Sequence, residues 1–308
     1  MTLVGIVDKW VESLDYEYEI STAACVRHKS PHSTCAACVE SCPEGAVEFL
    51  DDKPSIDSKV CTECGKCLAA CPAQAIAGIY PKRKMMQGTL IAEESHIPSA
   101  KELLVYYAKG MKAVGTEEDE MEQGWIESTT EANEYLSRMD AEPLQVKTGL
   151  SFPKEEERTV SRRELFSIWK QESKTLAKQV APAKWRFNHT DFDLAKHYRD
   201  IQFYSVKLDV SQCSLCRICE NLCIKQCFSL QDEQFMISSQ SCSDCKLCID
   251  TCPEKAIQIT NEIMKEQAET YPVYTKTCAS CKKEFKTLRA EEEKCFVCQK
   301  RQEGFLTS

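Results

Sequence analysis

The sequence predicts an α+β protein made of several small modules. A cysteine-containing run occurs four times, in two pairs that lie far apart in the chain. The stretch between the pairs alternates short apolar segments with segments of helical periodicity, which is typical of a small α/β fold. Two further CxxC pairs lie near the end of the sequence. A length of 308 residues with 43% hydrophobic and 28% charged residues fits two or three small globular domains.

The repeated run consists of a CxxC pair, three residues and a last cysteine followed by an apolar segment. Sixteen of the 21 cysteines belong to the four runs. These are Cys25, Cys35, Cys38 and Cys42; Cys61, Cys64, Cys67 and Cys71; Cys213, Cys216, Cys219 and Cys223; and Cys242, Cys245, Cys248 and Cys252. The first twenty residues lack a secretory pattern, so we expect a cytoplasmic protein with reduced thiols. Clustered cysteines in that compartment indicate metal binding.

The runs resemble those of the bacterial two-cluster ferredoxins over about residues 20–80 and 205–260. The resemblance implies four [4Fe–4S] clusters in two modules, residues 1–82 and 201–264, with the last cysteine of each run ligating the neighbouring cluster. Four ligand sets follow, each named by its first cysteine. They are the Cys25 set (Cys25, Cys35, Cys38, Cys71), the Cys61 set (Cys61, Cys64, Cys67, Cys42), the Cys213 set (Cys213, Cys216, Cys219, Cys252) and the Cys242 set (Cys242, Cys245, Cys248, Cys223).

Two of the runs depart from the family pattern. Nine residues separate Cys25 from Cys35 where the family usually has two, and this insertion contains His28 and His32. Either a histidine replaces Cys25 as ligand, or the insertion is a polar loop that shields the first cluster and exposes its histidines. In the third run, Cys227 stands where the other runs have alanine. We expect Cys227 to be a small buried residue, able to substitute if Cys223 were lost.

The remaining cysteines form two knuckles, Cys278-x2-Cys281 and Cys295-x2-Cys298, separated by thirteen residues. This segment, residues 272–303, resembles a zinc ribbon, which implies one Zn²⁺ held by four thiolates. Rubredoxin-type iron uses the same geometry, but its second knuckle usually carries proline and glycine, which CFVCQK lacks. A closed site of this kind stabilises a small domain or a docking surface and leaves no position for a substrate.

Residues 88–148 are predicted to form a small α/β insert. GTLIAEE and MKAVGTE are expected strands, SAKELLVYYAKG is an expected helix, and a second expected helix, TEANEYLSRM, precedes PLQVK. Because the sequence has no G-x-G pair and no G-x-x-x-x-G-K, a structural or docking role is favoured over a nucleotide site. Residues 154–200 are expected to be a helical linker, with apolar residues at near-helical intervals over 154–187.

The sequence favours a relay of electrons over catalysis. No flavin, nicotinamide, pterin or haem motif is visible, and no residue is predicted to be catalytic. The net charge of −9 argues against nucleic-acid partners, and no apolar stretch is long enough for direct membrane insertion. We therefore expect an electron-transfer subunit or dedicated carrier of a cytoplasmic oxidoreductase, whose partner is a redox protein or a catalytic subunit. The alternatives are a redox or oxygen sensor, and an enzyme acting at a cluster that lacks one thiolate.

Overall fold

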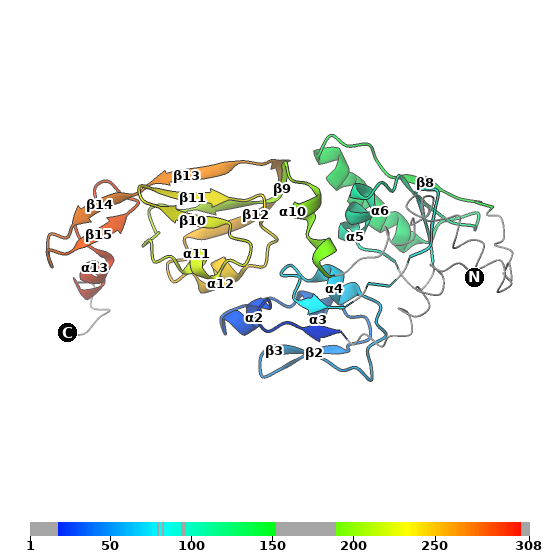
Figure 1. Ribbon diagram of the computed structural model, residues 1–308, viewed down its shortest axis with the longest axis horizontal. Coiled ribbons are helices and arrows are strands. Elements are labelled where there is room, and N and C mark those ends of the chain that lie inside the picture. Colours follow the sequence, from blue (N-terminus) through cyan, green and yellow to red (C-terminus); the bar gives the residue numbers. More distant parts are fainter. Residues whose placement is uncertain (1–17, 79, 82, 94–96, 152–188, 303–308) are drawn as a thin grey trace, which may run out of the picture. The chain divides into compact units, whose positions relative to one another are not determined.

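The computed structural model describes residues 18–78, 80–81, 83–93, 97–151 and 189–302, which contain a mixture of short helices and small sheets (Figure 1). Two compact units are built from interleaved segments. The first comprises residues 1–20, 38–48 and 55–194, and the second comprises residues 21–37, 49–54 and 195–308. The helix expected over 154–187, and most of the first twenty residues used to predict a cytoplasmic location, lie outside the described residues.

A four-stranded sheet organises the insert in the first unit. Its strands are β5 (Met85–Met86), β6 (Thr89–Ile91), β7 (Ala113–Gly115) and β8 (Gln145–Lys147), in that order. Strands β6, β7 and β8 are parallel, and β5 is antiparallel to β6. Helices α5 (Ala100–Ala108) and α6 (Gln123–Arg138) connect the parallel strands. The expected alternation of strands and helices is confirmed, although α6 begins at Gln123, ahead of the expected start at Thr130.

Helix α6 packs through one apolar stripe. Trp125, Thr129, Ala132 and Leu136 are its buried residues, and their spacing of three and four places them on the same face. The Trp125 indole Nε1 donates a hydrogen bond to the carbonyl of Glu93 at 3.4 Å, which satisfies its polar atom at the edge of the core.

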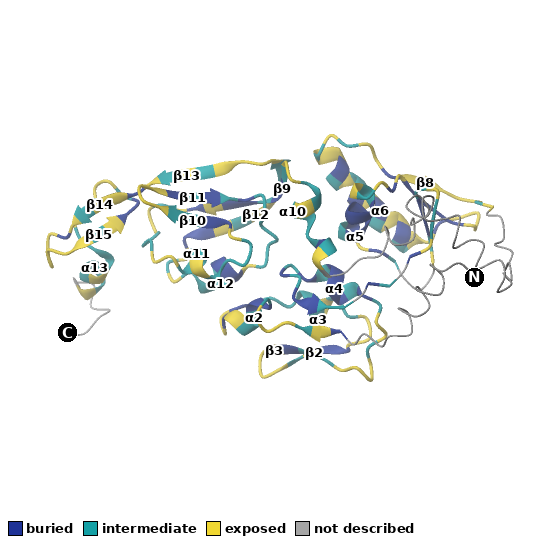
Figure 2. Ribbon diagram, in the orientation of Figure 1, coloured by how far each residue is buried: buried dark blue, intermediate teal, exposed yellow. Residues whose placement is uncertain are grey.

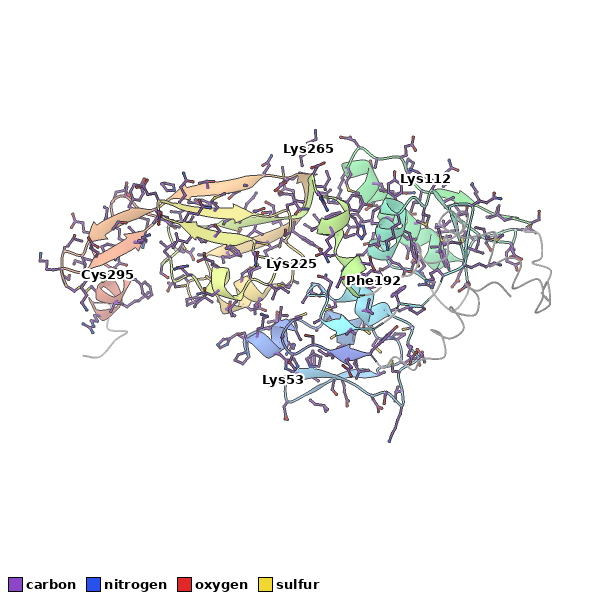
Figure 3. The ribbon with its side chains drawn as sticks, viewed as in Figure 1. Lys53, Lys112, Phe192, Lys225, Lys265 and Cys295 are labelled. Atoms are coloured by element: carbon purple, nitrogen blue, oxygen red, sulfur yellow. The ribbon has the colours of Figure 1, made fainter. Side chains whose placement is uncertain are left out.

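A buried ion pair connects helix α5 with the chain that follows the second cysteine run. Ser99 caps α5 by accepting a hydrogen bond from the Glu102 amide, and the Glu102 carboxylate lies 2.9 Å from Arg83 Nε. The Tyr80 hydroxyl donates to the same carboxylate. Burial raises the pKa of Tyr80, and the nearby Glu102 charge raises it further. The Tyr80 ring packs on Phe192, labelled in Figure 3, with centroids 4.7 Å apart.

The core of the second unit lies between small antiparallel sheets. Strand β9 (Ile201–Leu208) pairs with β12 (Ile257–Lys265), while β10 (Phe228–Gln231), β11 (Gln234–Ser238) and β13 (Ala268–Pro272) form a three-stranded sheet. Buried side chains from both sheets, including Phe228, Phe235 and Ile257, meet in one cluster with cysteines of the runs packed against it. Figure 2 colours the buried parts of β10 and β11 dark blue. Wherever cysteine side chains complete an apolar core in this way, the metal site and the fold depend on each other.

The other elements are short. They are β1 (Glu19–Ile20), α2 (Val26–Lys29), α3 (Ala37–Glu40), β2 (Val47–Leu50), β3 (Lys53–Ile56), α4 (Lys66–Ala70), β4 (Ile76–Ala77), η1 (His189–Phe192), α10 (Leu194–His197), α11 (Ile218–Leu222), α12 (Leu247–Thr251), β14 (Tyr274–Thr277), β15 (Glu284–Thr287) and α13 (Phe296–Gln302). None of the helices in the described part of the chain has the length and apolar character needed to cross a bilayer.

Candidate metal centres

The runs at residues 61–71, 213–223 and 242–252 share one backbone path. In each run the residues before and after the second cysteine have left-handed φ angles. These are Glu63 (54°) and Gly65 (77°), Leu215 (54°) and Arg217 (64°), and Asp244 (52°) and Lys246 (60°). The left-handed region is unfavourable for residues other than glycine by about 1–2 kcal/mol each. Its recurrence at matching positions indicates a loop shaped around something held by the cysteines.

The third cysteine of each run lies in a short helix, and the last cysteine follows that helix. Cys67, Cys219 and Cys248 lie in α4, α11 and α12 respectively. The last cysteine of each run leaves its helix in an extended conformation. This geometry keeps three thiols near one end of the helix and sends the fourth onward along the chain.

Backbone amides point at the cysteine sulfurs at repeated positions. The amide two residues after the first cysteine donates to its Sγ at 3.4 Å in two runs, from Glu63 to Cys61 and from Leu215 to Cys213. The amide four residues after the last cysteine donates to its Sγ in three runs, from Ala75 to Cys71 at 3.2 Å, from Cys227 to Cys223 at 3.4 Å and from Ala256 to Cys252 at 3.4 Å. Such N–H donors stabilise thiolates, which are the form that binds metal.

The first unit brings together the Cys61 set. Burial raises the pKa of Cys67 to about 12, and charges on Cys64, Cys61 and Cys42 raise it further. A small pocket is lined by all four cysteines and by Tyr18, whose hydroxyl donates to the Glu63 carbonyl at 2.9 Å. Four thiols around one pocket, from two runs of the chain, are the donor set that a cubane cluster requires.

The second unit brings together the Cys213 set in the same way. Burial raises the pKa of Cys219 to about 12, and charges on Cys213, Cys216 and Cys252 act on it. These thiols line a pocket whose other walls include Phe235 and Ile257. Such thiols need a metal to displace their protons, because the apolar surroundings disfavour the free thiolates.

The Cys242 set also converges, with one extra thiol. Burial raises the pKa of Cys248, and charges on Cys245, Cys242 and Cys223 add to the effect. The buried Cys227 thiol hydrogen-bonds Cys223 and Cys242. Its bond lowers the pKa of Cys223 to about 6 and also lowers that of Cys242. Cys227 is buried, as the sequence predicts, but its thiol also bonds the sulfurs of Cys223 and Cys242 as well as filling space.

The Cys25 set divides between the two units, with Cys25 and Cys35 in the second unit and Cys38 and Cys71 in the first. The insertion between Cys25 and Cys35 contains helix α2, so it is not entirely the loop that the sequence predicts. Cys25 is 8% exposed, His28 is half-buried in α2 and His32 is exposed. Arg27 in α2 donates to the Cys35 carbonyl and lies 4.0 Å from the centre of the Phe49 ring.

The C-terminal knuckles converge on one point. The Sγ atoms of Cys278, Cys281, Cys295 and Cys298 all lie within 4.8 Å of one another, as a tetrahedral thiolate site requires. Cys278 and Cys281 lie in the turn between β14 and β15, Cys295 directly precedes α13, and Cys298 lies in its first turn. Amide hydrogen bonds, chiefly from Cys281 and Cys295, lower the pKa of Cys278 to about 6.

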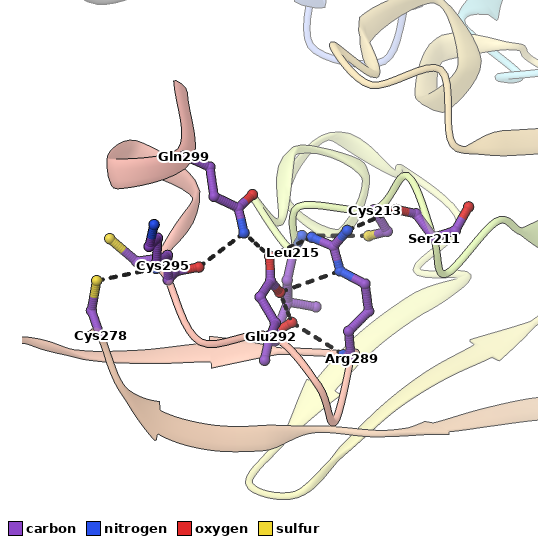
Figure 4. A network of polar contacts seen from close by, with 10 residues as sticks. Ser211, Cys213, Leu215, Cys278, Arg289, Glu292, Cys295 and Gln299 are labelled. Carbon is purple, nitrogen blue, oxygen red and sulfur yellow. Dashed lines mark hydrogen bonds and ion pairs between the residues drawn. The ribbon is translucent and has the colours of Figure 1, made fainter. Parts of the chain in front are cut away.

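A polar network connects this C-terminal segment with the Cys213 loop (Figure 4). Arg289 donates to the Ser211 carbonyl at 2.8 Å and pairs with Glu292 at 2.5 Å. Gln299 of α13 donates to the same Glu292 carboxylate. The Arg289 charge acts to lower the pKa of Cys213 against the larger effect of burial, which raises it. The C-terminal segment is therefore held against the loop that opens the third run.

A second contact within the second unit joins the insertion of the first run to α12. The Thr34 amide donates to Asp250 Oδ2 at 2.7 Å, and the Thr34 hydroxyl donates to the same carboxylate at 3.1 Å. The neighbouring Cys35 adds its charge to the environment of Cys245, whose pKa burial raises to about 12. Cysteines of the Cys25 and Cys242 sets therefore lie near each other in this unit.

Sequence reasoning missed an acidic cleft in the insert. It has a volume of about 700 Å³ and opens at the carboxyl ends of β6 and β7, where ligands often bind to parallel sheets. Its lining residues include Lys84, Glu93, Glu117, Glu118, Glu120 and Glu122. The run of glutamates in GTEEDEMEQ is the available signal, and by itself it indicates only a solvated loop.

Comparison with known proteins agrees with the geometry of the runs. Residues 33–75 match the 4Fe–4S dicluster domain. The chain is 46% identical over 44 residues to the ferredoxin-like protein in the nif region of Rhizobium leguminosarum bv. trifolii, covering 12% of this chain and 69% of that protein. It is 43% identical over 42 residues to one subunit of the ion-translocating oxidoreductase complex of Methanosarcina acetivorans, but that stretch covers only 14% of this chain and 16% of the relative. It is 46% identical over 41 residues to the Ferredoxin 7Fe of Hydrogenibacillus schlegelii, covering 13% of this chain and 53% of the relative.

Proposed function

Since the chain belongs to the ferredoxin-like iron–sulfur proteins, we propose that it binds four [4Fe–4S] clusters and relays single electrons for an oxidoreductase. The observation that carries the proposal is the backbone path shared by the runs at 61–71, 213–223 and 242–252, with left-handed residues at matching positions. Repetition of a strained loop and of its N–H···S bonds indicates that the three runs hold the same kind of group.

The residues around the cysteines have two tasks in this proposal. A bound cluster supplies one-electron chemistry at a potential set by its protein environment. The amides of Ala75, Leu215 and Ala256 direct partial positive charge at the sulfurs, which favours the more negative reduced state. Apolar walls such as Phe235 and Ile257 exclude water and oppose that state. The balance between the amide donors and the apolar walls sets the reduction potential of each cluster.

The contact between Thr34 and Asp250 supports exchange of electrons between clusters of the two modules. It connects residues close in sequence to Cys35 and Cys248, which belong to the Cys25 and Cys242 sets. A continuous relay needs clusters from the two modules to approach one another. The charge of Cys35 that acts on Cys245 is consistent with such an approach.

The C-terminal segment and the α/β insert support a role of this chain as a subunit or dedicated carrier. The C-terminal segment, proposed to bind one Zn²⁺ through Cys278, Cys281, Cys295 and Cys298, and the α/β insert both add surface beyond the cysteine runs. A net charge of −9 suits docking to a basic face of a redox protein or catalytic subunit. One relative is itself named as a subunit of an oxidoreductase complex.

Metal analysis after anaerobic reconstitution of the full chain tests the cluster count. Four cubanes predict about sixteen iron and sixteen acid-labile sulfide ions per chain, with one zinc resistant to dialysis. Fewer than about eight irons would contradict the four-cluster proposal. Anaerobic affinity purification from the native cell, with mass spectrometry of co-purifying proteins, tests the role: a stoichiometric redox enzyme is expected, and recovery of the chain alone would contradict the subunit proposal.

A further inference from the structure

Two serine hydroxyls next to the candidate clusters of the second module are buried without a hydrogen-bond partner. They are Ser214 Oγ and Ser243 Oγ, and both are shielded from solvent. Each serine directly follows the first cysteine of its run, Cys213 or Cys242. Buried hydroxyls are nearly always bonded, so two orphans at the same position of two repeats require an explanation.

Ser214 lies at the candidate site of the Cys213 set. Ser214 lines the pocket enclosed by the Cys213 set, together with Phe235 and Ile257. None of the cysteine sulfurs in the described residues accepts from this hydroxyl. The acceptor has to be something that occupies the pocket, and the sulfide ions of a bound cluster are the acceptors that such a pocket would hold.

The second run has a hydroxyl at the same position on a different and exposed residue, Thr62. Thr62 directly follows Cys61 and lines the pocket of the Cys61 set. A hydroxyl-bearing side chain therefore stands at this position in three runs, although the residues around it differ. Serine and threonine share the hydroxyl and little else, so the hydroxyl is the property that the position retains.

We infer that Ser214 and Ser243 are built-in hydroxyl donors to the sulfide sulfurs of the two clusters of the second module and raise the reduction potentials of those clusters. Reduction adds negative charge to the cluster, so a donor aimed at its sulfur stabilises the reduced form more than the oxidised form. The inference rests on the proposed cluster binding. It adds that the side chain after the first cysteine tunes the potential.

The test compares Ser214→Ala with Ser214→Thr and with the wild-type protein, using the reconstituted full chain and EPR-monitored redox titration. Ser211→Ala is the matched control, because the Ser211 hydroxyl is bonded to Asp209 at 2.6 Å and lies on the surface. Ser214→Ala is expected to make reduction of one cluster about tenfold less favourable, a shift of about −59 mV for one electron. Ser214→Thr should restore most of the shift, and Ser211→Ala should leave every potential unchanged.

Iron and sulfide contents separate failure of this inference from failure of the proposed function. A Ser214→Ala protein with its full iron content and unchanged potentials would overturn the hydroxyl role while leaving the relay intact. A wild-type protein that forms no cluster at the Cys213 and Cys242 sets would overturn both. If Ser214→Ala loses iron, Ser243→Ala gives an independent measurement: a lowered potential of the other cluster supports the inference, and an unchanged one refutes it.

Discussion

Substituting alanine at Gly65 tests whether the second run requires glycine for packing or only for its backbone angle. Gly65 has φ 77° and precedes helix α4. A Cβ added there would lie 2.5 Å from Tyr80 Cε2 and 2.8 Å from Pro81 Cδ. The Tyr80 ring cannot move aside easily, because it is 1% exposed and its hydroxyl is bonded to Glu102.

The expected loss has two parts that a matched variant separates. The left-handed angle contributes about 1–2 kcal/mol, and overpacking against the Tyr80 ring contributes about 1–3 kcal/mol. Gly45→Ala shares the first part only, because Gly45 has φ 67° and nothing lies within 4 Å of an added Cβ. Gly65→Ala should therefore destabilise the protein by about 1–3 kcal/mol more than Gly45→Ala.

Anaerobic urea denaturation of the reconstituted proteins measures this difference, followed by far-ultraviolet circular dichroism and by cluster absorbance. Because bound clusters make unfolding unsuitable for a two-state treatment, the comparison uses the midpoint and the rate of cluster loss under identical conditions. Equal losses for Gly65→Ala and Gly45→Ala would refute the packing argument. The loss would then belong to the backbone angle alone.

Three further predictions follow from the described contacts. Glu102→Gln should lower stability to urea by about 3–5 kcal/mol because it leaves the Arg83 charge buried without its partner. Glu117→Gln, in an exposed pair with Lys84, should change stability by at most about 1 kcal/mol. Equal effects of the two substitutions would contradict a stabilising role for the buried Arg83–Glu102 pair. Cys227→Ala should keep the full iron content and Cys223→Ala should lose one cluster's iron, and retention of that iron would show that Cys227 substitutes as a ligand. A zinc chelator should release one zinc and make residues 272–303 sensitive to limited proteolysis while cluster absorbance stays constant, and an unchanged digestion pattern would contradict a structural zinc.

The cysteine runs can be recognised in the sequence because ligand chemistry restricts the residues that can hold a cluster, and residues 33–75 match the 4Fe–4S dicluster domain. Only cysteine supplies the thiolate, and the spacing of the cysteines is fixed by the size of the group they hold, so the four runs are visible without any knowledge of the fold. The strands and helices of the insert were predictable for a similar reason: burial of one face imposes a period on the apolar residues, as Trp125, Thr129 and Leu136 show.

The interactions between distant segments were not predictable. Arg83 and Glu102 are charged residues of a type that is mostly exposed in proteins, yet their side chains are 3% and 1% exposed. Each can be buried only because the other neutralises it, and nothing in the local sequence records that pairing. The network from Gln299 through Glu292 to Arg289 is hidden for the same reason. Hydroxyls such as that of Ser214 are ordinary in a sequence and become informative only when their burial is known.

The left-handed residues show how far a repeat can constrain a chain against its local preferences. Leu215 and Asp244 adopt φ angles of 54° and 52°, which a leucine in particular avoids. Glycine is the residue that favours such angles, but the sequence has leucine and aspartate at these positions. The energy that stabilises the strained backbone must therefore come from contacts that the loop makes with other groups. Leu215 packs against the core of the second unit and the loop has a few N–H···S bonds, and under the proposed function ligand bonds to a cluster add to these contacts. The first run has no left-handed residue between Cys25 and Cys38, a stretch that the structure describes throughout, and it has helix α2 there instead. The insertion therefore gives the first run a backbone path that differs from that of the other three runs.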